Sequence, residues 1–155
     1  MRAMWFGFVV YMLVLVKLIL FKQARFFLSH IKHFGLSNIK EGEGHLILIP
    51  FHTTWRCLYG ERGWWEAIAN IGGNILGFVP MGIMLPILFS KLNSAKRVIT
   101  TVSVISLCFE LTQFIIGVGY CDIDDLIQNT LGGAIGYYVY KRFGKNSFGT
   151  SGLLH

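Results

Sequence analysis

Acidic residues are rare in this chain, and half of them gather in one short stretch. Of the eight, Asp122, Asp124 and Asp125 lie in a turn between two apolar segments, and Glu110 lies inside the apolar segment that precedes the turn. A carboxylate in an apolar helix is costly unless a partner compensates for it, so its presence indicates a function. These four residues are therefore the first candidates for chemistry.

The acidic turn admits two interpretations. Clustered carboxylates can hold Mg²⁺ or Ca²⁺ through oxygen ligands, and together with a buried Glu110 they could carry out acid–base chemistry. Alternatively, an aspartate at the start of a helix satisfies free N–H groups and complements the helix dipole. One aspartate is enough for capping, and this turn has three. No known metal-loop, nucleophile-elbow or phosphate-loop pattern is present, so we assign no metal, cofactor or catalytic residue and keep a divalent cation as an open alternative.

Carboxamides occur in the same apolar segments, three or four residues from another polar side chain, so that each pair shares a helix face. A rise of about 1.5 Å per residue places them at similar depths, and we expect a polar pocket open to the outside of the membrane. Hydrogen bonds between helices are the structural alternative. The candidates are Asn70, Asn74, Gln113 and Asn129, beside Glu110, Asp122, Asp124 and Asp125, with Lys17, Arg56 and Arg62 as possible counter-charges.

The composition places these residues in a membrane. The 155 residues are 54% hydrophobic and 14% charged, whereas soluble domains carry roughly 25% charged residues. The net charge of +6 comes mostly from residues between apolar segments, where it suits anionic lipid headgroups rather than nucleic acid. The three cysteines do not have the spacing of a zinc site.

The apolar runs predict an all-α, polytopic membrane protein with about four transmembrane helices. Residues 1–22 form the first, residues 23–65 an interfacial helix followed by an outer loop, residues 66–140 a core of three more, and residues 141–155 a basic tail. We expect irregular structure over residues 38–65, with an aromatic belt at Trp55, Tyr59, Trp64 and Trp65. Pro80 and Pro86 should bend or shorten the second helix.

Glycines four residues apart in two of these helices let another helix approach closely. They are Gly73 with Gly77 and Gly132 with Gly136. The short loops set the orientation, because basic loops stay in the cytoplasm. Loop 90–97 and the C-terminal segment are basic, so we predict cytoplasmic termini and an outside location for turn 119–125, although six basic residues in loop 22–65 count against this.

Three motifs in this order resemble the VanZ-like family of bacterial membrane proteins. They are residues 74–83 (Asn-Ile-Leu-Gly-Phe-Val-Pro-Met-Gly-Ile), Glu110-Leu111-Thr112-Gln113, and residues 122–137 from the acidic turn to Tyr137. Ile49-Pro50-Phe51 also matches that family, and the similarity covers roughly residues 46–140. Many members carry an arginine shortly before the first aspartate, which this chain lacks between Val118 and Cys121.

The resemblance implies a multi-pass protein of the bacterial cell membrane. The founding member of that family is associated with low-level teicoplanin resistance. We therefore expect the outward acidic pocket to lower sensitivity to glycopeptide antibiotics of the teicoplanin type. The partners would be the lipid bilayer and either the antibiotic or a lipid-linked cell-wall precursor. A membrane hydrolase or transferase acting on such precursors and a structural or partner-binding subunit are the alternatives, and the oligomeric state stays open.

Overall fold

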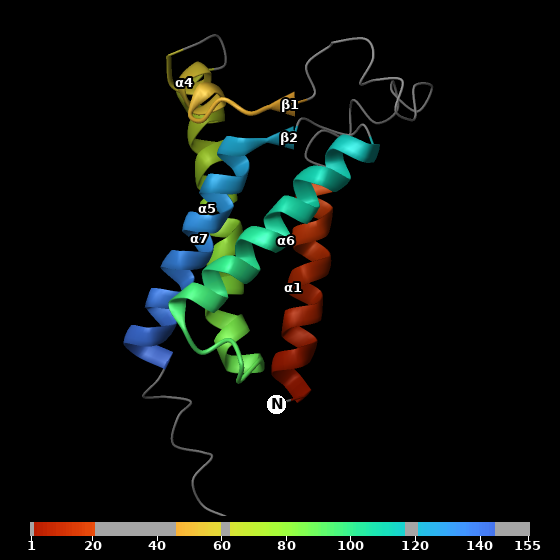
Figure 1. Ribbon diagram of the computed structural model, residues 1–155, viewed down its shortest axis with the longest axis vertical. Helices are drawn as coiled ribbons and strands as arrows, with labels where there is room; N and C mark the ends of the chain where they lie inside the picture. The colour runs from red at the N-terminus through yellow and green to blue at the C-terminus, as the bar shows by residue number, and fades with distance from the viewer. Residues whose placement is uncertain (1, 21–45, 60–62, 117–120, 145–155) are drawn as a thin grey trace, which may run out of the picture.

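The computed structural model describes residues 2–20, 46–59, 63–116 and 121–144, and this part of the chain is mostly helical. Four long helices run side by side along the molecule (Figure 1). One end of the molecule, here called the basic end, contains the start of the first helix, the connection between the second and third helices, and the end of the fourth (Figure 1). The other, here called the acidic end, carries a short helix and two short strands (Figure 1). The elements are α1 (Arg2–Leu20), β1 (Leu46–Ile47), α4 (His52–Tyr59), α5 (Gly63–Leu88), α6 (Ala95–Ile116), β2 (Cys121–Asp122), α7 (Ile123–Val139) and the π-helix η2 (Tyr140–Gly144).

Three helices in the described ranges are long and apolar enough to cross a membrane. They contain the stretches Arg2–Ile19, Ala67–Leu88 and Ala95–Ile115. Helix α7 has 17 residues and is about 26 Å long, somewhat less than a hydrocarbon core of about 30 Å. The predicted helical, membrane-type architecture is confirmed, but a fourth full crossing is not shown. The interfacial helix predicted within 23–65 lies outside the described residues.

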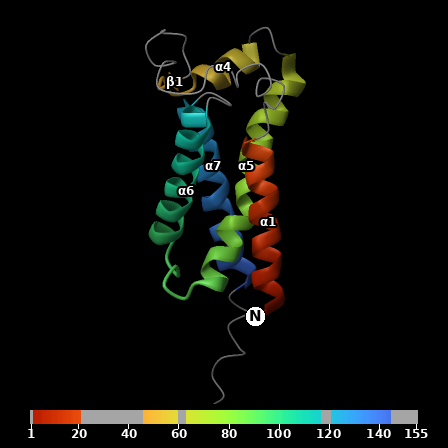
Figure 2. The same ribbon diagram turned by 90° about the vertical axis from the view of Figure 1, so that its right-hand side faces the viewer.

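The irregular structure predicted over residues 38–65 is partly wrong. Strand β1 pairs with β2 in parallel, with Leu46 opposite Cys121 and Ile47 opposite Asp122. Helix α4 follows and lies across the acidic end of the bundle (Figure 2). The extended run before Pro50 thus finds its partner strand about 75 residues later. Helix α4 is capped by Asp124, equally far away in the sequence, so local patterns did not predict it.

Helix α5 continues through both of its prolines. It runs unbroken over 26 residues with Pro80 and Pro86 inside it, so of the two predicted effects, bending or shortening, the prolines do not produce the second. A proline removes one backbone hydrogen bond, but membrane helices tolerate this where neighbouring helices support the chain. Helix α5 has such support, because it contacts α1, α6 and α7.

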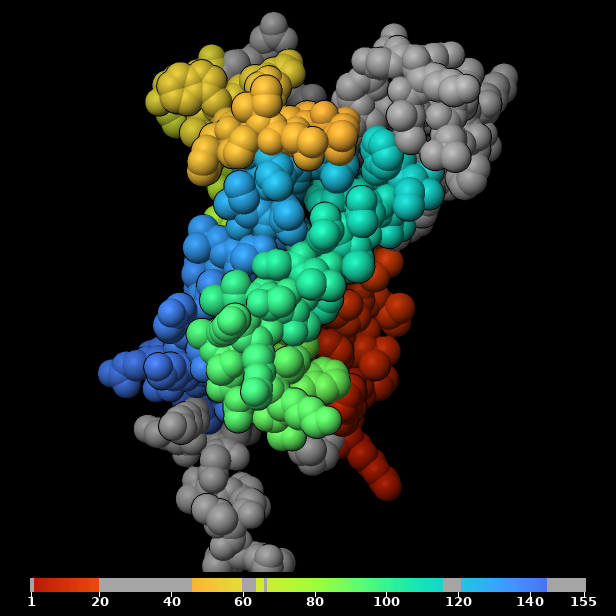
Figure 3. Space-filling view, in the orientation of Figure 1, coloured from red at the N-terminus to blue at the C-terminus, as the bar shows by residue number. Residues whose placement is uncertain are grey.

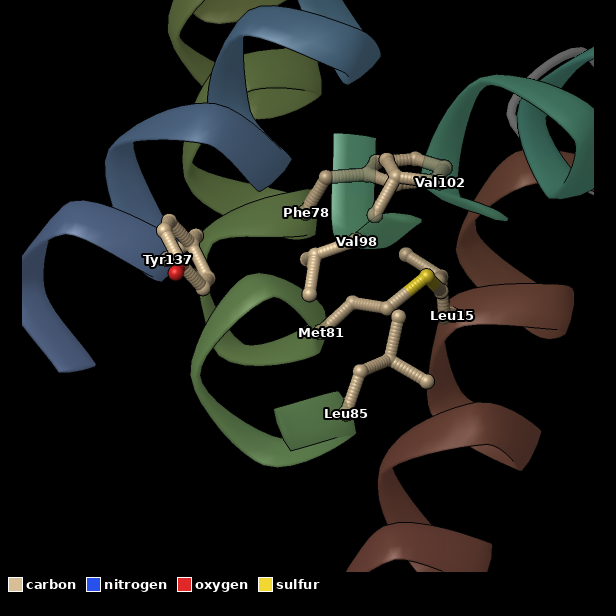
Figure 4. Packing of buried hydrophobic residues seen from close by; sticks show 7 residues of the cluster. All are labelled: Leu15, Phe78, Met81, Leu85, Val98, Val102 and Tyr137. Carbon is tan, nitrogen blue, oxygen red and sulfur yellow. The ribbon is translucent and has the colours of Figure 1, made fainter. Parts of the chain in front are cut away.

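The apolar core lies between the four long helices. Its cluster contains Leu15 of α1, Met81 and Leu85 of α5, and Val98 and Val102 of α6 (Figure 4). Phe78 and Tyr137 complete the cluster, and the hydroxyl of Tyr137 donates to the carbonyl oxygen of Asn93 over 3.2 Å. This bond ties the end of α7 to the connection between α5 and α6.

Helices α5 and α7 touch through their backbones. A Cβ built on Gly132 would lie 2.1 Å from the carbonyl oxygen of Ile75, and one on Gly136 would lie 2.1 Å from that of Val79. The approach is mutual, because a Cβ on Gly82 of α5 would lie 2.1 Å from the carbonyl oxygen of Gly133. This contact therefore requires glycine on both helices, and Gly82 is a partner that the sequence pattern did not identify.

The glycine pair predicted on α5 has a different environment. A Cβ on Gly73 would meet nothing within 4 Å, and one on Gly77 would meet only the end of the Leu15 side chain at 3.6 Å. The described part of the chain therefore does not show the close helix packing that was predicted at Gly73. Gly77 contributes its carbonyl oxygen, which accepts a hydrogen bond of 2.7 Å from the hydroxyl of Tyr11 on α1.

Gly132→Ala should destabilise the bundle, because the new methyl group forces two backbones apart. Overpacking typically costs about 1–3 kcal/mol, so we expect a lower melting temperature in detergent. Cys57 and Cys121 are buried, and a thiol-reactive dye would report unfolding through them. Gly73→Ala is the matched control and should leave the melting temperature unchanged or slightly raised. Equal effects of the two changes would contradict the backbone contact.

Candidate functional site

Two of the acidic residues fix the start of α7. Asp122 is the N-cap of this helix, and its Oδ1 accepts a hydrogen bond of 2.9 Å from the backbone N–H of Asp124. The backbone N–H of Asp122 donates in turn to Oε2 of Glu110 over 3.0 Å. Glu110 is only 2% exposed, so a glutamate inside α6 binds the turn that starts α7.

The second aspartate of the turn caps a different helix. The Asp124 carboxylate is 2% exposed and lies at the N-terminus of α4. Its two oxygens accept backbone N–H groups, Oδ1 from Phe51 and Oδ2 from Thr54, the latter at 2.8 Å. These N–H groups lack partners within α4, and a negative charge also complements the dipole of the helix. Asp124 therefore connects α7 to α4 over about seventy residues of sequence.

Thr54, Asn74, Asp125 and Gln128 form a hydrogen-bonded group at the same end, here called the amide cluster. Nδ2 of Asn74 donates to Oδ1 of Asp125 over 2.6 Å and to Oε1 of Gln128 over 3.0 Å. Nε2 of Gln128 donates to Oγ1 of Thr54 over 3.2 Å. The cluster joins α4, α5 and α7, and these bonds are only partly buried.

The remaining predicted carboxamides lie apart from this cluster. Nδ2 of Asn129 donates to Oγ of Ser106 on α6 over 2.9 Å, and Nε2 of Gln113 donates to the carbonyl oxygen of Ile19 on α1 over 3.1 Å. Asn70 is half-buried one turn before Asn74. The structure thus divides the expected single pocket into separate contacts between helices.

Three basic residues were predicted as counter-charges to the carboxylates described above. Lys17 and Arg56 are both exposed, and Arg62 lies outside the described residues. Lys17 and Glu110 form no ion pair with each other in the described part of the chain. A counter-charge role for these three residues stays a prediction.

Cys121 directly precedes Asp122, the N-cap of α7. Burial raises the pKa of its thiol, and the negative charges of Glu110 and Asp122 raise this pKa further. The thiol is therefore held in its protonated form and is a poor nucleophile at neutral pH.

This arrangement is better suited to holding helices than to reacting with a substrate. Glu110, Asp122 and Asp124 each accept a backbone N–H. Within the described ranges no group of three or more His, Cys, Asp or Glu residues is placed to hold a metal ion. An open apolar groove of about 240 Å³ lies elsewhere, and none of the predicted candidates lines it; its residues are Ile99, Thr100, Ser103, Val104, Leu107 and Leu126.

Sequence reasoning missed Thr54, Ser106 and Gln128. Gln128 lies three residues after Asp125, so helical spacing could have placed both on one face. Ser106 lies four residues before Glu110 and carried a similar signal. Thr54 carried none, because its place in the cluster depends on α4.

Asp124→Ala should release α4 from the bundle. Losing a helix cap costs about 0.5–2 kcal/mol, and a change of about 1.4 kcal/mol is tenfold in an equilibrium. Cys57 of α4 is buried, so its alkylation in membrane vesicles should become about tenfold faster in a chain that also carries Cys108→Ser and Cys121→Ser. Asp125→Ala is the control, because Asp125 binds Asn74 rather than the N-terminus of α4. Unchanged alkylation of Cys57 in the Asp124 variant would contradict the capping role.

Comparison with known proteins identifies the family of this chain. The chain is 39% identical over 67 residues to Protein VanZ of Enterococcus faecium, which covers 43% of this chain and 41% of that protein. The chain thus matches only about two-fifths of the length of this curated relative. No solved structure matches. The VanZ/LLP1 family model matches residues 8–144. Since that match covers most of the chain, including α5, α6, α7 and the acidic turn, the protein belongs to the VanZ/LLP1 family.

Proposed function

We propose that this protein acts in the bacterial cell envelope and lowers sensitivity to glycopeptide antibiotics of the teicoplanin type. Family membership and the three apolar helices support a membrane protein of the VanZ type. The observation that carries the proposal is the amide cluster, which gathers a carboxylate, two carboxamides and a hydroxyl from three helices at the acidic end.

The proposed orientation places this end outside the cell. Basic residues described at the opposite end are all exposed, namely Arg2, Lys91, Lys96, Arg97, Lys141 and Arg142. Basic segments at the ends of membrane helices favour the cytoplasmic side. The acidic end and the amide cluster would then face the compartment in which glycopeptides meet their cell-wall targets.

In this mechanism the amide cluster contacts the polar part of an amphiphile, either the antibiotic or a lipid-linked envelope precursor. Asn74 and Gln128 offer carboxamides, and Asp125 offers a carboxylate that suits a cationic group. A lipid tail would remain in the bilayer beside α5, near the aromatic residues at its start. Asp122, Asp124 and Glu110 are positioning residues here, because they hold α4 and α7 in place.

The two alternatives have less support. A hydrolase or transferase would need a carboxylate directed at a substrate, and the carboxylates of Glu110, Asp122 and Asp124 already accept backbone N–H groups. An assembly subunit would use its glycine faces for a partner, and Gly132 and Gly136 already contact α5. The experiment below can still return either result.

The test is antibiotic susceptibility in a sensitive Gram-positive host. The wild-type chain should raise the inhibitory concentration of teicoplanin by several doubling dilutions over empty vector, and that of vancomycin by less. Asp125→Asn combined with Asn74→Ala should remove this protection because it disrupts the amide cluster. Lys96→Gln, at the opposite end, is the control and should protect fully. All variants must reach the membrane in equal amounts.

The outcomes separate the parts of the proposal. If the wild type gives no protection, a role in glycopeptide sensitivity is wrong for this chain. If the cluster variant protects as well as the wild type, the envelope role stands and the amide cluster is not its site.

A further inference from the structure

Helix α4 and the start of α5 carry an exposed aromatic surface, formed by Phe51, Trp55, Tyr59, Trp64 and Trp65. Each of these side chains is at least 63% exposed, and Trp65 is 83% exposed. The rings of Trp55 and Tyr59 lie one helical turn apart with centroids separated by 4.2 Å. Large aromatic side chains that point outward together indicate a surface that meets something less polar than water.

The position of this surface indicates what it meets. The apolar stretch of α5 begins at Ala67, so Trp64 and Trp65 lie immediately before the point where that helix enters the hydrocarbon. Tryptophan and tyrosine favour this level of a bilayer because their rings combine apolar faces with a polar N–H or O–H group. Helix α4 lies across the same end (Figure 2), and its gold and yellow atoms cover the top of the molecule above the start of α7 (Figure 3). The aromatic surface therefore lies just beyond the apolar stretch of α5, where a bilayer crossed by that stretch would have its headgroups.

The opposite side of α4 is attached to the protein. Cys57 is buried, Thr54 joins the amide cluster, and the helix N-terminus is capped by Asp124. Arg56 is exposed beside Trp55, where its guanidinium group suits a lipid phosphate. Helix α4 thus binds the bundle through its polar groups and presents aromatic rings outward.

The backbone at the start of α4 supports a fixed orientation. Phe51 has a φ of 64°, a left-handed conformation that is rare for a bulky residue and persists where neighbouring contacts impose it. The contact here is the Phe51 N–H, which donates to Asp124. The same bond that caps α4 therefore directs the chain at its first aromatic residue.

We propose that α4 is an in-plane membrane anchor, which inserts this aromatic surface into the headgroup region of the lipid bilayer, and that Asp124 holds it at that depth. The partner is the phospholipid surface itself. The inference stands independently of any role in antibiotic sensitivity, because it concerns only how the acidic end sits in the membrane.

Fluorescence quenching in reconstituted vesicles tests this anchor. The chain has four tryptophans, so Trp5→Phe, Trp64→Phe and Trp65→Phe leave Trp55 as the only reporter. In phosphatidylcholine vesicles, lipids brominated near the headgroup end of the acyl chain should quench Trp55 more than lipids brominated near the chain terminus. Iodide in the water phase should quench it weakly.

Adding Asp124→Ala should shift the emission of Trp55 to the red and increase quenching by iodide, because α4 loses its fixed position. Lys96→Gln, exposed at the basic end, is the control and should behave like the parent chain. If Trp55 is quenched by iodide as strongly as free tryptophan and not by brominated lipid, the surface faces water and the proposal is wrong. If lipid quenching appears only when the protein is diluted in the bilayer, another copy of the chain covers the surface, and the proposal is likewise wrong.

Discussion

The acidic end depends on a short series of hydrogen bonds from carboxylates to backbone N–H groups. Glu110 accepts the N–H of Asp122, Asp122 accepts that of Asp124, and Asp124 accepts those of Phe51 and Thr54 at the start of α4. The first bond connects α6 to β2, the second connects β2 to α7, and the two at Asp124 connect α7 to the start of α4. Bonds to ionised groups in a poorly solvated region are stronger than neutral ones. The hydrogen bonds that Glu110 and Asp124 accept thus offset the cost of burying these two carboxylates.

This series explains why one turn needs several aspartates. Asp122 caps its own helix, Asp124 caps a helix that lies far away in the sequence, and Asp125 accepts a carboxamide from α5. The sequence left both cation binding and helix capping open for this turn. The structure favours capping, and the turn caps two helices, α7 and α4. The amide cluster is formed where α4 and α7 of this series meet α5, and its hydrogen bonds are partly buried.

Much of the helical architecture could be predicted from the sequence, because hydropathy and helix length are local properties. The predicted start of α7 at the acidic turn agrees with Asp122 as its N-cap, since an aspartate before an apolar run carries its own signal. Helix α4 could not be found in this way. Its first residues include two threonines, but the cap comes from Asp124, about seventy residues away. Gly82 was missed for a similar reason, because its requirement for glycine arises from the backbone of α7.

The contacts that attach α1 to the bundle depend little on which side chains α1 carries. Only 6% of its apolar stretch is buried, and one of its two polar attachments uses the carbonyl oxygen of Ile19, which any residue would supply. Tyr11 is the exception, because its hydroxyl reaches Gly77. Most side chains of α1 are exposed, as expected for an apolar helix that faces lipid on most sides. Unrelated apolar helices that place a tyrosine at the same height could replace it during evolution while the acidic end stayed intact.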